Sequence, residues 1–162
     1  MKAWQTLRFS TLKKEENITQ RPQGTIAKHG KKRRDKIMTE NEISNKVIGI
    51  AIDLHRKLVP GLLESAYENA LAFDLRESGS DVKQQYPMPF IYKEVKLDVG
   101  YRLDLLINNK VIIEVKSVEK LAPVHYAQLL TYLKLSDLRL GLLINFNTKL
   151  LKNDIHRIVN NL

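Results

Sequence analysis

The sequence contains no cysteine and no long apolar run. The absence of cysteine from the 162 residues excludes a disulfide scaffold, a thiol nucleophile and any zinc or iron–sulfur site with cysteine ligands. It also fits a reducing compartment, and we expect the protein in the cytoplasm. Because no run of about 18 apolar residues is present, we predict neither a transmembrane helix nor a membrane partner. A chain of this length accommodates one domain and a tail.

Acidic residues are scarce in the first part of the chain only. Residues 1–37 hold 11 Lys and Arg against 3 Asp and Glu, whereas residues 38–162 hold 16 against 15. The net charge of +9 therefore resides almost wholly in the first 37 residues. The composition of the remainder predicts no obvious basic groove, so an inference from global charge applies to the first segment.

Residues 1–37 lack the apolar periodicity of a folded element. They include the basic run Lys31–Arg34, and a segment of this composition buries too little apolar surface to offset the entropy of ordering. We predict a mostly disordered tail. Three explanations of it stay open: an arm that binds phosphates, a targeting segment, or incidental sequence upstream of a second start at Met38.

From Met38 the apolar pattern predicts one domain, residues 38–162, of the α/β class. A helical period recurs in three segments, 43–58, 62–77 and 123–136, and Pro60-Gly61 separates the first two. Strand-like patterns occupy five segments, 82–92, 95–99, 101–107, 111–116 and 140–146. Pro87 and Pro89 favour an edge or a bulge for the first of these strands. A short amphipathic helix over 154–159 completes the predicted order α-α-β-β-β-β-α-β-α.

Two adjacent strands carry the residues with chemical potential. Alternation places Arg102 and Asp104 on one face of the first strand, and Glu114 and Lys116 on one face of the second. The opposite faces are apolar and should meet a core; they carry Tyr101, Leu103, Leu105 and Ile107 in the first strand and Val111, Ile113 and Val115 in the second. A three-residue loop over 108–110 pairs Ile107 with Val111 and sets the two carboxylates opposite each other. A two-residue loop would mix the apolar and polar faces, so burial selects the longer loop.

Two carboxylates facing each other in a sheet repel unless a cation lies between them. Mg²⁺, or Mn²⁺ in its place, takes oxygen ligands, and Asp104, Glu114 and the carbonyl of Val115 would supply three. Lys116 could orient an attacking water or offset charge on a phosphoryl group. The competing interpretation is a solvated sheet face with an ordinary cross-strand ion pair.

Asp104, nine intervening residues and Glu114-Val115-Lys116 resemble the core signature of the PD-(D/E)XK nuclease superfamily. The segment Gly61–Tyr67 (GLLESAY) is similar to the motif that names the GxxExxY proteins within that superfamily. Segments 125–133 and 141–146 resemble later motifs of the same group. The resemblance begins at about Ile43 and leaves the tail outside.

The resemblance implies a role for each matching residue. Asp104 and Glu114 resemble the metal-binding carboxylates, and Lys116 resembles the catalytic lysine. Glu64 resembles a first-helix glutamate directed at the same metal, and Gln128 resembles a helix glutamine beside the site. The resemblance also implies a restriction-endonuclease-like core, α-β-β-β-α-β, with a mixed central sheet, flanking helices and one additional N-terminal helix. Leu103 departs from the pattern, because the superfamily name places proline there.

Several further residues admit two interpretations. His125, Gln128 and Tyr132 share one helix face that either looks into the site or forms a polar surface stripe. Tyr67 is expected to pack or to form a hydrogen bond to the site rather than to act as a nucleophile. Arg102 could contact phosphate or pair with Asp104.

The sequence thus predicts a metal-dependent nuclease that hydrolyses phosphodiester bonds, with DNA as the expected nucleic-acid partner. The alternative is a non-catalytic nuclease-like module that binds nucleic acid or a protein. A small-molecule enzyme using the same carboxylate pair is a third interpretation. A homodimer is a further expectation, since a compact domain could need a second copy to contact both strands.

Overall fold

The computed structural model describes residues 37–58, 60–93 and 95–162. The predicted disordered tail lies outside these residues, apart from Ile37. Three helices form in the described part: α1 (Glu40–Lys57), α2 (Glu64–Glu77) and α3 (Pro123–Leu135). Its strands are β1 (Val82–Tyr92), β2 (Val95–Ile107), β3 (Val111–Lys116), β4 (Leu140–Asn145) and β5 (Ile155–Val159), with a short 3₁₀ turn over Leu151–Asn153. Among these described helices, none is long and apolar enough to cross a membrane.

The three longer predicted helices are confirmed, and their ends have local causes. The hydroxyl of Thr39 accepts a hydrogen bond from the backbone N–H of Glu42, whose carboxylate accepts one from the Thr39 N–H. This reciprocal capping box fixes the start of α1. Between α1 and α2, Gly61 has a φ of +90°, a conformation that favours glycine. The sharp turn delivers Glu64 as the first residue of α2.

The strands form one mixed sheet in the order β1-β2-β3-β4-β5. Strands β3 and β4 are parallel, and the other neighbouring pairs are antiparallel. The α/β class with a restriction-endonuclease-like arrangement is therefore confirmed. The predicted edge position of β1 is also confirmed, and its register shifts between Met88 and Phe90, beside Pro89. Proline fits there because an edge or a bulge does not require its missing N–H.

Two predictions about the strands were wrong. Segments 95–99 and 101–107 form the single strand β2, because Gly100 continues the extended backbone. Residues 155–159 form strand β5 where a helix over 154–159 was predicted. A segment this short forms a poor helix, whereas as a strand it pairs with β4 and covers backbone groups that would otherwise form an exposed sheet edge.

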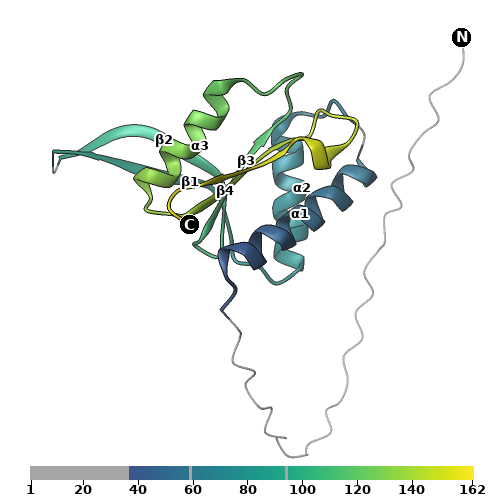
Figure 1. Cartoon of the computed structure of the whole chain (residues 1–162), viewed down its shortest axis with the longest axis horizontal. Coiled ribbons are helices and arrows are strands. Elements are labelled where there is room, and N and C mark those ends of the chain that lie inside the picture. Colours follow the sequence, from purple (N-terminus) through teal and green to yellow (C-terminus); the bar gives the residue numbers. More distant parts are fainter. Residues whose placement is uncertain (1–36, 59, 94) are drawn as a thin grey trace, which may run out of the picture. The chain divides into compact units, whose positions relative to one another are not determined.

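Helices cover both faces of the sheet (Figure 1). Helices α1 and α2 pack on one face through a cluster that includes Val47, Tyr67 and Leu71. Helix α3 packs on the other face, where Leu129 and Leu133 contact a second cluster. Strand β4 is buried along its whole length between the layers. Because β3 and β4 are parallel, their C-terminal ends, at Lys116 and Asn145, lie side by side at one end of the sheet.

The alternation of β2 changes near Asp104. Leu105 and Ile107 pack into the cluster beneath α1 and α2, as predicted. Leu103 and Tyr101, predicted on the same face, pack into the α3 cluster instead. That prediction assumed regular alternation along the strand, which fails where the recorded pairing of β2 with β3 ends at Leu105 and Ile113. Asp104 lies at this irregularity.

Candidate active site

The structure brings together Asp104, Glu114 and Lys116, the three residues predicted on the two adjacent strands. The pairs Ile107–Val111 and Leu105–Ile113 confirm the register set by a three-residue loop. Asn108 and Asn109 in that loop have φ values of 50° and 55°, in the left-handed region that asparagine tolerates. One residue beyond the recorded pairs, Oδ2 of Asp104 accepts a hydrogen bond of 2.9 Å from the backbone N–H of Val115. The Asp104 side chain thus bridges β2 and β3.

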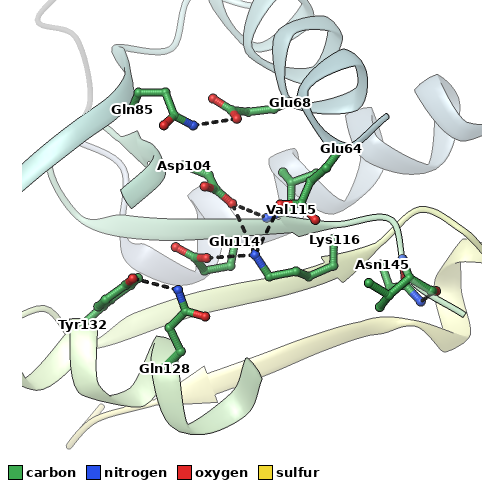
Figure 2. Close-up of polar contacts among 11 residues, drawn as sticks. Glu64, Glu68, Gln85, Asp104, Glu114, Val115, Lys116, Gln128, Tyr132 and Asn145 are labelled. Carbon is green, nitrogen blue, oxygen red and sulfur yellow. Dashed lines mark hydrogen bonds and ion pairs between the residues drawn. The ribbon is translucent and has the colours of Figure 1, made fainter. Parts of the chain in front are cut away.

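The Lys116 ammonium lies among three carboxylates (Figure 2). Its Nζ is 3.4 Å from Oε2 of Glu114, 3.5 Å from Oε1 of Glu64 and 3.9 Å from Oδ2 of Asp104. The acids come from β3, α2 and β2, so three elements separated in sequence converge on one cation. We call Glu64, Asp104 and Glu114, together with Lys116, the carboxylate cluster. The side chain of Lys116 is only 13% exposed, which strengthens these attractions relative to those at a water-covered surface.

Glu114 occupies an unfavourable place for a charge. Its side chain is 2% exposed, and Oε1 has no hydrogen-bond partner within the described part of the chain. Burial, reinforced by repulsion from Asp104, raises the pKa of Glu114 from 4.5 to about 8 despite the attraction of Lys116. A buried carboxyl with an unused oxygen is suited to a ligand that brings positive charge.

Asp104 and Lys116 are perturbed by the same cluster. Burial raises the pKa of Asp104, although the Val115 hydrogen bond and Lys116 oppose the rise. Burial alone would lower the pKa of Lys116, but the attraction of Glu114, Asp104 and Glu64 raises it above 10.5. The lysine therefore stays charged at neutral pH. Burial acts in the opposite sense on the acids and favours the protonated forms of Glu114 and Asp104.

Glu68 is a member of this neighbourhood that the sequence analysis missed. It lies one helical turn after Glu64, is 5% exposed, and adds to the repulsion on Asp104. Its Oε2 accepts a 2.7 Å hydrogen bond from Nε2 of Gln85, and Oε1 has no partner among the described residues. The spacing of four between two glutamates on one helix was the signal that could have identified it.

The predicted α3 stripe divides into two parts. Gln128 donates a 2.7 Å hydrogen bond to the hydroxyl of Tyr132. Burial raises the pKa of Tyr132, and electrostatic repulsion from Glu114 and Asp104 adds to this shift. The Tyr132 hydroxyl therefore interacts electrostatically with the two carboxylates. His125 has a local task instead, because its Nδ1 accepts a hydrogen bond from the Ala122 N–H at the start of α3.

Asn145 and Ser117 hold the chain just beyond Lys116. The buried amide of Asn145 accepts from the Val118 N–H at 3.0 Å and donates to the Val118 carbonyl at 2.9 Å. The Ser117 hydroxyl donates to the carbonyl of Leu62 at 2.8 Å, two residues before Glu64. These bonds tie β3 to β4 and to the start of α2. Sequence reasoning missed both residues because such roles depend on distant backbone.

Two other predicted residues differ in burial. Tyr67 is fully buried and its ring stacks on Phe146 with centroids 4.6 Å apart, as expected of a packing residue. Its hydroxyl also accepts a hydrogen bond from the Leu62 N–H. Arg102 is exposed.

The donor set fits a divalent cation. Carboxylate oxygens of Asp104, Glu114 and Glu64 all lie within 3.9 Å of the Lys116 ammonium. Oε1 of Glu114 is buried without a hydrogen-bond partner in the described chain. No group of three His, Cys, Asp or Glu side chains within residues 37–58, 60–93 and 95–162 has the arrangement of a complete metal site. A cation would accordingly need a backbone carbonyl and water as well, which is common for Mg²⁺.

Comparison with known proteins relates most of the domain to one family. A family model described as the PD-(D/E)XK nuclease superfamily matches residues 41–158. The matched segment begins within α1, ends within β5, and contains all the residues of the carboxylate cluster. Neither the curated proteins nor the solved structures that were compared include a match to this chain.

Proposed function

The chain belongs to the PD-(D/E)XK nuclease superfamily, and from this membership and the site we propose that it is a metal-dependent nuclease that hydrolyses phosphodiester bonds, with DNA as substrate. One observation carries the proposal: a single ammonium, on a side chain that is only 13% exposed, lies 3.4–3.9 Å from three carboxylates on two strands and a helix. A structural ion pair needs one partner for each charge, whereas this cluster has three carboxyl groups around one ammonium.

The surplus acid supports a metal role. Asp104, Glu114 and the carbonyl of Val115 would hold Mg²⁺ or Mn²⁺, and Glu64, whose side chain is 42% exposed, would bind through its outer water shell. The bound cation would polarise the scissile phosphate and lower the pKa of a coordinated water. The Val115 N–H, by donating to Oδ2 of Asp104, fixes the orientation of that carboxylate before any ligand arrives.

Lys116 is proposed as the catalytic lysine. Its ammonium remains protonated at neutral pH, because three carboxylates raise its pKa. It can therefore donate hydrogen bonds to an attacking water and offset negative charge on the phosphoryl oxygens in the transition state. Gln128, on the neighbouring face of α3, is proposed as a positioning residue that acts through the Tyr132 hydroxyl.

The motif over Gly61–Tyr67 supports a narrower family assignment. Gly61 needs its positive φ, Glu64 reaches Lys116, and Tyr67 packs the helix against the sheet. Each specified position of GxxExxY thus has a physical role here. We infer that the chain lies in the GxxExxY branch of the superfamily.

The test is a cleavage panel of linear duplex, single-stranded DNA, branched DNA and RNA, each with Mg²⁺, Mn²⁺ or EDTA. The inactive comparison is Glu114→Ala/Lys116→Ala. A matched control, Glu77→Ala/Lys134→Ala, removes the same two residue types from exposed positions on α2 and α3. We expect metal-dependent cutting that the control retains and the site variant loses.

Two results would contradict the proposal. Equal cutting by the site variant would mean that the activity comes from elsewhere. No cutting by a folded protein whose melting temperature is unchanged by Mg²⁺ and Mn²⁺ would favour the non-catalytic binding module.

A further inference from the structure

A second feature, outside the carboxylate cluster, is a pocket rimmed by cations. It has a volume of about 360 Å³ and lies between the end of α1 and the segment that follows β4. Arg56, Lys149 and Lys152 line it, and apolar side chains, among them the half-exposed Leu150, form the rest with His55 and Pro60. Among the described residues that line it, none is an aspartate or a glutamate.

The pocket has a fixed architecture. Nε2 of His55 donates a 2.9 Å hydrogen bond to the carbonyl of Thr148, which joins α1 to a segment 93 residues later in the chain. The ring of His55 also lies 6.4 Å from the ring of buried Phe146. This bond joins the helix that carries Arg56 to the segment that carries Lys149 and Lys152.

The pocket lies near the C-terminal ends of β3 and β4, the same end of the sheet as the carboxylate cluster. Phe146, two residues before Thr148, donates its N–H to the carbonyl of Lys116 at 2.8 Å. Pro60 precedes Glu64 by four residues, and four residues span at most about 14 Å of extended chain. One strand of B-DNA carries a phosphate for about every 3.4 Å of its axis. The part of the pocket at Pro60 is therefore within a few nucleotides of Glu64.

The charge of the pocket contrasts with that of the domain. Residues 38–162 carry 16 Lys and Arg against 15 Asp and Glu, yet three basic residues line one pocket without an acid. Arg56 forms a 3.0 Å ion pair with Asp53, but both side chains are well exposed and such pairs are weak. Basic residues in the last turn of α1 also suit its helix dipole, an explanation that does not extend to Lys149 and Lys152.

We propose that this pocket binds the sugar–phosphate backbone of the nucleic acid beside the bond that is cut, with Lys149 and Lys152 contacting phosphates and Leu150 contacting sugar. The inference rests on the proposed nuclease function, because it is the neighbouring carboxylate cluster that identifies the ligand as a nucleic acid. It supplies the basic surface that the overall composition of the domain did not predict.

The experiment measures the salt dependence of binding. Full-length wild type, Lys149→Ala/Lys152→Ala and a matched Lys83→Ala/Lys134→Ala control are titrated into labelled duplex and single-stranded DNA. EDTA keeps the DNA intact, and KCl is varied between about 50 and 200 mM. The control lysines lie near the other end of the sheet, since Lys83 pairs with Leu106 and Lys134 is near the end of α3. The basic tail is common to all three proteins and cancels in the comparison.

We expect the pocket variant to bind duplex about tenfold more weakly and to lose about 1.8 from the slope of log K against log salt, because each phosphate contact contributes about 0.9. The control should match wild type. The pocket variant should keep the melting temperature of wild type, since its substituted lysines are exposed.

An unchanged affinity and slope in the pocket variant would overturn the inference. If wild type still cuts DNA in the cleavage panel, that result removes the pocket and leaves the nuclease proposal standing. If wild type neither binds nor cuts any nucleic acid, both fall. Lysine-dependent binding to phosphatidylserine vesicles in the absence of DNA binding would also overturn the inference and assign the pocket to a lipid headgroup.

Discussion

The backbone N–H of Val115 donates a 2.9 Å hydrogen bond to Oδ2 of Asp104, and this side chain takes over where the recorded pairing of β2 with β3 stops. The carboxylate that would bind a metal is thus also a structural link between two strands. The same oxygen lies 3.9 Å from the Lys116 ammonium. Charge and hydrogen-bonding roles of Asp104 can therefore be separated by substitution.

Asp104→Asn and Asp104→Ala should separate these roles. Asparagine keeps an oxygen for the Val115 N–H but removes the charge, so folding stability should stay near that of wild type while cleavage falls at least about 100-fold. Alanine leaves the Val115 N–H without its partner and should lower the free energy of unfolding by about 1–3 kcal/mol. Urea unfolding and single-turnover cleavage measure the two effects. Full cleavage by Asp104→Asn would exclude a role for the charge.

Glu114 should make the metal-free protein less stable as pH rises. Its pKa is raised from 4.5 to about 8 in the folded protein, so the folded state binds a proton that the unfolded state releases. The stabilisation from this proton is complete below about pH 4.5 and is lost as the pH rises through about 8. Burial raises the pKa of Asp104 in the same direction.

Thermal unfolding in EDTA between pH 5 and 9, at about one-unit steps, tests this slope. Glu114→Gln keeps the shape of the side chain without a titrating group, so its melting temperature should vary less with pH than that of wild type. Parallel curves for the two proteins would show that Glu114 does not titrate in this window.

Lys116→Met should convert the site into an uncompensated acidic cluster. Methionine fills similar space, but the three carboxylates lose the cation that lies 3.4–3.9 Å away. We expect about 1–3 kcal/mol of destabilisation in EDTA near neutral pH, less than for a fully ionised cluster because Glu114, with a pKa of about 8, is largely protonated there. We also expect a cleavage loss of about 10²–10³-fold. Added Mg²⁺ should raise the melting temperature of this variant more than that of wild type, because the metal would replace the missing charge. Differential scanning fluorimetry measures it, and a smaller metal response than wild type would contradict the proposed ligand set.

The elements around the site could be predicted because local rules and burial agreed there. Thr39 caps α1, Gly61 turns the chain toward Glu64, and the apolar alternation of 111–116 fixed the register of β2 with β3. That register predicted that Asp104 and Glu114 lie close together, and in the structure Asp104 lies one residue beyond the paired segment, held by the Val115 N–H. The charge pattern and the strand period thus contained the same information about the site.

The parts that could not be predicted depend on partners far away in the sequence. Strand β5 exists because β4 offers an edge, which no local pattern of residues 155–159 announces. The shift of Leu103 to the α3 face depends on where strand pairing ends. Lys149 and Lys152 line one pocket with Arg56 because the segment after β4 lies against the end of α1, where His55 bonds Thr148. The near-neutral net charge of residues 38–162 gives no indication of this local group of basic residues.

Gln85→Ala tests whether the buried Glu68 depends on its amide partner. Gln85 adopts a φ of 50° on β1 and places Nε2 2.7 Å from Oε2 of Glu68, whose other oxygen has no partner in the described chain. Removing the amide leaves a buried carboxylate unsatisfied, which should cost about 1–3 kcal/mol of unfolding free energy. The matched control is Gln84→Ala, which removes an exposed 2.8 Å bond to Asn69 and should cost less than about 1 kcal/mol.

A further variant of the same pair identifies the source of that cost. Because Glu68 repels Asp104, Glu68→Gln in the Gln85→Ala background should recover part of the lost stability by removing the unsatisfied charge. Urea unfolding of the four proteins in this double-mutant cycle gives the coupling between the two side chains. Additive effects of the two substitutions would show that the Gln85 side chain does not stabilise the Glu68 carboxylate, and that the cost of Gln85→Ala arises from the backbone conformation at that position.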